Sequence, residues 1–102
     1  MAYENGDLDA TLAAAAGDDP ALMKELRAAF AESLAHQLDL LERARCDANW
    51  NVAAMRLKGL AAGFHANGLI ALAEEAISGA PGDPVVLRRI TAYLAEFQAA
   101  QA

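Results

Sequence analysis

The chain has 102 residues, of which 56% are hydrophobic types and 22% are charged. This length suits a single domain over residues 1–102, and the hydrophobic content is too high for a disordered chain. The formal net charge of −6 disfavours binding to nucleic acid and to anionic membrane surfaces. We therefore expect a soluble domain with no nucleic acid and no membrane among its partners.

The cysteine content and the first residues indicate a compartment. Cys46 is the only cysteine, so no disulfide can form within the chain. The first residues are acidic and polar, unlike a secretion signal. No apolar run reaches the ~18 residues that a membrane span needs. Together these features predict a cytoplasmic protein.

Two Asp-Pro pairs, Asp19-Pro20 and Asp83-Pro84, indicate helix starts. The Asp side chain accepts backbone N–H groups at a helix start, and Pro has no N–H to leave unpaired. The full pattern predicts five helices and no strand. In chain order they cover about 8–16, 20–45, 47–65, 67–78 and 84–100.

The four longer helices each carry an apolar stripe at helical spacing. Four such helices with short connections predict an antiparallel four-helix bundle. The fold class is therefore all-α, with the short first helix covering one end of the bundle through Leu8 and Leu12. The predicted core residues of the second, fourth and last helices are Leu22, Leu26, Phe30, Leu34, Leu41, Ala44, Leu69, Leu72, Ala76, Ile77, Leu87, Ile90, Leu94 and Phe97.

The third helix has a second, outward stripe of apolar and small residues. Its core face is marked by Trp50, Leu57 and Phe64, and the stripe falls on the opposite side at 100° per residue. A glycine inside a helix costs about 1 kcal/mol relative to alanine, but it lets another molecule approach closely. Methionine suits adaptable binding surfaces. The stripe comprises Val52, Met55, Gly59 and Ala62, with Arg56 and Lys58 beside it.

We interpret this stripe as a partner-binding surface with an apolar centre and positive edges. Two structural alternatives remain open from the sequence. The stripe could pack beneath the first helix or a loop, or an alanine-rich helix could simply tolerate these residues.

The segment DANWNVAAMRLKGLAAGFHANGLIALAEEA, residues 47–76, resembles the histidine-containing phosphotransfer (HPt) domain of phosphorelays. The family pattern is an Ala-His pair, one variable residue and Leu-Lys-Gly, and residues 54–59 read AMRLKG here. Asp47 and Trp50 resemble the family's turn into this helix, and Glu74-Glu75 its acidic helix end. The resemblance implies a helical bundle whose partners are response-regulator receiver domains and histidine kinases.

The resemblance fails at the phosphoacceptor. The family's histidine falls on position 55, where this chain has methionine. A thioether cannot act as the nitrogen nucleophile that accepts a phosphoryl group, so histidine phosphotransfer at Met55 is chemically excluded. By the resemblance, Lys58 lies where the family neutralises phosphoryl charge and Gly59 where it leaves room for a receiver. His65 stands where the family usually has glycine.

Neither histidine of the chain is a good substitute for the missing one. His65 is ten residues beyond Met55, about 15 Å along a helix, and His36 is on the flank of the second helix. One cysteine and two scattered histidines have no metal-ligand spacing, and no glycine loop suits a nucleotide. We predict no catalytic residue, no metal site and no cofactor.

Three functions remain open from the sequence. The leading hypothesis is an HPt-like signalling module, not an enzyme, that docks a receiver domain or a histidine kinase through the outward stripe. The second is an active phosphotransfer protein that uses another histidine, or whose natural residue at position 55 is histidine. The third is a structural domain that forms a homodimer through the stripe. We favour a monomer over a homodimer.

Overall fold

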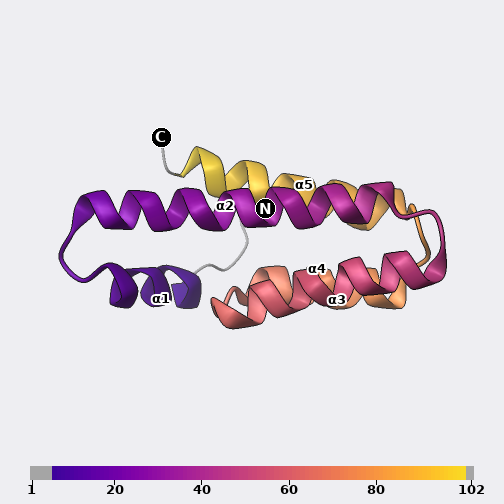
Figure 1. Ribbon diagram of the computed structural model, residues 1–102, viewed down its shortest axis with the longest axis horizontal. Helices are drawn as coiled ribbons and strands as arrows, with labels where there is room; N and C mark the ends of the chain where they lie inside the picture. Colours follow the sequence, from indigo (N-terminus) through magenta and orange to yellow (C-terminus); the bar gives the residue numbers. More distant parts are fainter. Residues whose placement is uncertain (1–5, 101–102) are drawn as a thin grey trace.

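The computed structural model describes residues 6–100, and that range contains five α-helices and no strand (Figure 1). The all-α prediction is therefore confirmed. The predicted ends of each helix are correct to within two residues, and the fourth helix has the predicted bounds. The helices are α1 (Gly6–Ala16), α2 (Pro20–Arg43), α3 (Asp47–Gly63), α4 (Asn67–Ser78) and α5 (Pro84–Ala99).

Aspartate side chains cap α2 and α5 as predicted. Asp19 Oδ1 accepts the N–H groups of Ala21 and Leu22 at 3.0 and 3.2 Å. Asp83 Oδ1 accepts the N–H of Val85 at 3.0 Å. Each bond satisfies a backbone donor that the first turn of a helix leaves unpaired. These two caps fix where the chain enters its longest helix and its last one.

The end of α3 is earlier than predicted, at Gly63 instead of His65. His65 has a φ of 56°, and the N–H of Ala66 donates to the carbonyl of Ala61 at 2.8 Å. The N–H of His65 also donates to the carbonyl of Ala62 at 3.1 Å. This pair of bonds is a Schellman motif, which stops a helix with one left-handed residue. The chain then reverses directly into α4.

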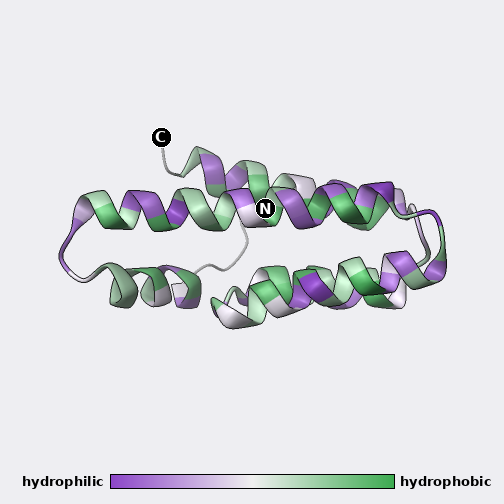
Figure 2. Cartoon of the chain, viewed as in Figure 1, coloured by the Kyte–Doolittle hydropathy of each residue, from purple (hydrophilic) through white to green (hydrophobic). Residues whose placement is uncertain are grey.

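The four longer helices enclose one core. α3 packs against α2 and α4, and α5 packs against the same two helices. Figure 1 shows the helices running along the long axis of the molecule, with α3 and α4 beside one half of α2 and α1 beside the other half. Figure 2 shows polar and apolar residues alternating along the long helices, as expected for amphipathic helices.

The core is built from large side chains that are almost fully shielded from solvent. The indole N–H of Trp50 donates to the carbonyl of Ala76 at 2.7 Å, so the one buried indole has its hydrogen bond. The Phe30 ring meets Phe64 and Phe97 edge to face, with centroids 5.1 and 5.2 Å apart. The largest fully buried side chains are Trp50, Tyr93, Phe30, Phe97, Leu8, Leu12, Leu34, Leu41, Leu57, Leu69, Leu72 and Ile90.

The predicted core was wrong at its edges. Four leucines that we expected inside are only half-buried, while Val86 and Tyr93 are buried instead. The buried face of α5 is centred on positions 86, 90, 93 and 97, which places 87 and 94 at its rim. The half-buried leucines are Leu22, Leu26, Leu87 and Leu94. Ile77 and Phe64, which we also expected in the core, are half-buried as well.

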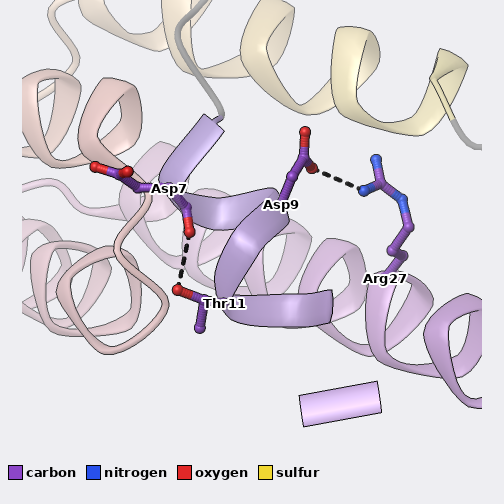
Figure 3. A network of polar contacts seen from close by, with 4 residues as sticks. All are labelled: Asp7, Asp9, Thr11 and Arg27. Atoms are coloured by element: carbon purple, nitrogen blue, oxygen red, sulfur yellow. Dashed lines mark hydrogen bonds and ion pairs between the residues drawn. The ribbon is translucent and has the colours of Figure 1, made fainter. Parts of the chain in front are cut away.

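α1 packs against α2, with Leu8 and Leu12 fully buried. Figure 3 shows Asp9 of α1 facing Arg27 of α2, and the two side chains are 3.0 Å apart. The Arg27 guanidinium also lies 4.4 Å from the centre of the Phe97 ring. Asp7 accepts a hydrogen bond from Asn67, the first residue of α4, at 2.6 Å. α1 is therefore attached to α2 and α4.

The connection between α1 and α2 consists of residues 17–19. Gly17 has a φ of 63°, and its N–H donates to the carbonyl of Ala13 at 2.9 Å. Only glycine adopts this left-handed conformation without strain. The turn reverses the chain and sends α2 back past α1.

Candidate docking surface on α3

The outward stripe of α3 is exposed to solvent. Val52 and Met55 are 49% and 50% exposed, and Gly59 and Ala62 are exposed as well. Within residues 6–100, only Val85 is a further large hydrophobic residue with comparable exposure. Two of these three residues therefore lie one turn apart on the same helix. Within residues 6–100, neither α1 nor a loop covers the stripe, which contradicts the alternative that it packs beneath the first helix or a loop.

The opposite side of α3 determines which residues face outward. Ala53, Ala54, Leu57 and Ala61 are buried, and α3 makes its most extensive packing with α4. The small side chains of Ala54 and Ala61 allow a close approach between helices, while Leu57 fills the core. Because these contacts fix the rotation of α3, Met55 is held on the outside.

Gly59 has no structural role within residues 6–100. A Cβ placed on Gly59 would meet no atom within 4 Å outside its own helical turn, and its φ is not positive. Neither close packing nor backbone conformation requires a glycine at this position. The conformational cost of the glycine, about 1 kcal/mol relative to alanine, is therefore unexplained by the fold.

Lys58 borders the stripe on the α4 side. Its Nζ lies 3.3 Å from Glu74 Oε2, and the two side chains are 40% and 57% exposed. Glu75 forms a second ion pair with Arg89 of α5. Both glutamates therefore pair with cations of neighbouring helices while remaining partly exposed. Exposed ion pairs of this kind contribute about 0–1 kcal/mol to stability. A carboxylate of a partner could therefore replace Glu74 in the ion pair with Lys58.

Arg56 borders the stripe on the α2 side, where it makes no hydrogen bond or ion pair with residues 6–100. It lines a cavity between α2 and α3 with a volume of about 360 Å³. The sequence pattern did not predict this cavity, because it depends on how closely the two helices pack. Its lining residues are Leu40, Arg43, Ala44, Asn49, Val52, Ala53 and Arg56.

Both histidines are exposed and lie away from the centre of the stripe. His65 lies in the turn after α3, and His36 is on α2. Within residues 6–100, no three His, Cys, Asp or Glu side chains gather in a way that could hold a metal ion. None of the helices in this range combines the length and the apolar character needed to cross a membrane.

Comparisons of the chain with protein-family models, with curated proteins and with solved structures gave no match. A functional assignment therefore depends on the residues themselves. Those residues form a bare apolar stripe on α3, with Arg56 on one side and the Lys58–Glu74 pair on the other.

Proposed function

We propose that this chain is a degenerate HPt domain that docks a receiver domain or a histidine kinase without carrying phosphate. In this proposal the helices form an antiparallel four-helix bundle with α1 as an additional helix, and the protein works as a cytoplasmic adaptor, decoy or inhibitor. One observation carries it: Met55, at the position that the resemblance assigns to the phosphoacceptor, is held at the exposed centre of the stripe.

Charge supports this class of partner. The phosphorylation face of a receiver domain is acidic around its aspartate, and Arg56 and Lys58 lie on either side of the apolar stripe. The net charge of −6 opposes approach of an acidic partner to the rest of the surface. Such a distribution favours one docking orientation and raises the association rate.

The absence of phosphotransfer follows from the chemistry of position 55. The methionine sulfur has no proton to exchange and cannot form a phosphoramidate. Met55→His would place an imidazole at the same exposed position, one turn before Lys58. We expect that this variant accepts phosphate from a phosphorylated receiver as an acid-labile label, and that the unaltered chain does not. Label on the unaltered chain that is lost on changing His36 or His65 would instead support an active protein.

Docking is tested by titrating the full chain against purified receiver domains and kinase dimerisation domains, measured by surface plasmon resonance. We expect at least one domain to bind. Met55→Glu and Gly59→Leu should each weaken the affinity for that domain at least tenfold. Val85→Glu is a matched control, because Val85 is 49% exposed on α5. The proposal is wrong if no such domain binds, or if all three variants bind as the unaltered chain does.

A homodimer is the second candidate, because Val52 and Met55 together form an exposed apolar surface. Sedimentation velocity at two protein concentrations separates the two functions. A docking module is expected to remain a monomer. A dimer that Met55→Glu dissociates and Val85→Glu does not would favour the homodimer.

A further inference from the structure

The cavity between α2 and α3 is continuous with the stripe. Val52 belongs to both, since it is half-exposed on the stripe and also lines the cavity. A molecule that covers Met55 and Val52 therefore reaches the mouth of the cavity. The volume of about 360 Å³ is within the range of about 300–1,000 Å³ that is usual for ligand sites.

The cavity lies in a basic region of an acidic protein. Residues 43–58 contain four basic residues and one acidic residue, whereas the whole chain has a net charge of −6. Two of the four basic residues, Arg43 on α2 and Arg56 on α3, line the cavity. This concentration of positive charge identifies an anionic group as the ligand.

Contacts within the protein leave these two guanidinium groups available. Arg45 donates to the carbonyl of Glu42 at 2.9 Å, and Lys58 is paired with Glu74. Arg43 has only a long contact of 3.4 Å to Asp39, with both side chains more than half exposed. Arg56 has no partner within residues 6–100. Arg43 and Arg56 can therefore turn towards an incoming anion.

The floor of the cavity is apolar. Ala44 and Ala53 are buried, Leu40 is half-buried, and Val52 forms one wall. An inorganic anion would leave this floor uncovered. A carboxylate next to an apolar side chain would suit this site better. The carboxylate would bind the guanidinium groups through paired hydrogen bonds, and the apolar side chain would cover the floor. The small alanine side chains give the apolar group room to enter.

We propose that this cavity is a subsite for an acidic segment of a partner protein, in which Arg43 and Arg56 hold a Glu or Asp carboxylate while a neighbouring apolar side chain covers Leu40 and Val52. The subsite deepens the proposed function and rests on it for the identity of the whole partner. The partner would therefore carry an acidic residue and an apolar residue next to the surface that contacts Met55.

The first experiment uses short peptides and needs no receiver. The full chain labelled with ¹⁵N is titrated with the capped peptide Leu-Glu-Glu-Leu, and NMR shifts are followed. We expect millimolar binding that shifts the backbone signals of Asn49, Val52 and Arg56. The neutral peptide Leu-Gln-Gln-Leu should not produce these shifts, and sodium phosphate should produce smaller ones.

The variants make this experiment specific. The double substitution of Arg43→Gln with Arg56→Gln should lower the affinity for the acidic peptide at least fivefold. Arg88→Gln is the matched control, because Arg88 is exposed on α5 and lines a different cavity. The subsite is overturned if the acidic peptide causes no local shifts, or if the double variant binds it unchanged. Equal shifts with phosphate alone would also overturn it, by indicating a site for inorganic anions.

The second experiment separates this inference from the proposed function. Any receiver or kinase domain that binds the chain is titrated against the same double variant, and we expect at least tenfold weaker binding. If no domain binds but the acidic peptide does, the proposed function fails and the subsite stands. If a domain binds equally to the double variant, the subsite fails and docking through Met55 stands.

Discussion

At the scale of single residues, Gly59 lowers the stability of α3 while it keeps the stripe open. Replacing it with alanine should raise the free energy of unfolding by about 1 kcal/mol, because the new Cβ meets no neighbouring atom within 4 Å. Urea denaturation measures this change. The reverse substitution Ala62→Gly, at an exposed position of the same helix, should lower stability by a similar amount. A destabilised Gly59→Ala variant would show that the fold itself needs this glycine.

His65 is strained in a way that glycine would relieve. Its φ of 56° places a side chain in the left-handed region, which costs about 1–2 kcal/mol for most residues. Replacing His65 with glycine removes this strain, but the greater conformational freedom of glycine in the unfolded chain offsets part of the stability gained. We expect His65→Gly to raise stability by about 0.5–1 kcal/mol in urea denaturation. His36→Gly, inside α2, is the contrasting control and should destabilise the protein.

At the scale of elements, α5 places the Tyr93 side chain in the core. Burial of its phenol, with a smaller effect from the charge of Asp9, raises its pKa from 10.0 to about 12. The folded state therefore holds the proton more tightly than the unfolded state. The resulting stability is present below pH 10 and is lost as the pH rises towards 12. The loss should amount to about 2 kcal/mol.

This alkaline loss is measured by urea denaturation between pH 9 and 12. The unaltered chain should lose more stability over this interval than Tyr93→Phe, which has no phenol to ionise at that position. Parallel curves for the two proteins would show that Tyr93 ionises as easily in the folded state as in the unfolded one.

At the scale of the whole molecule, residues 43–58 carry four basic residues and one acidic residue in a chain with a net charge of −6. Association with an acidic partner should therefore depend on salt. Between about 50 and 300 mM NaCl we expect the association rate to fall severalfold, with a smaller change in the dissociation rate. Surface plasmon resonance measures both rates. Arg56→Gln should reduce this salt dependence, and Arg88→Gln should not.

Local features of this molecule could be predicted well from the sequence. Features that depend on the packing between helices could not. The Asp-Pro pairs located the starts of α2 and α5, because the caps involve neighbouring residues only. The early end of α3 was missed because the left-handed residue there is His65, where glycine would have been the usual signal. The exposure of Met55 followed from helical periodicity.

Contacts between helices could not be read from periodicity alone. The Lys58–Glu74 pair and the cavity lined by Arg43 and Arg56 need the distance and rotation between neighbouring helices. Tyr93 was missed for the same reason, since its burial depends on how α5 is rotated against α2 and α4. A closer reading of the basic residues on both sides of the short turn at residues 44–46 could have indicated the cavity.

The turn at Gly17 determines where the apolar side chains of α1 pack. A residue with a Cβ would be strained at the φ of Gly17, and a straightened connection would join α1 and α2 into one continuous rod. The leucines of α1 would then pack on the α2 of a second molecule, as in a domain-swapped dimer. Because the chain bends here, Leu8 and Leu12 of α1 are buried within the same molecule.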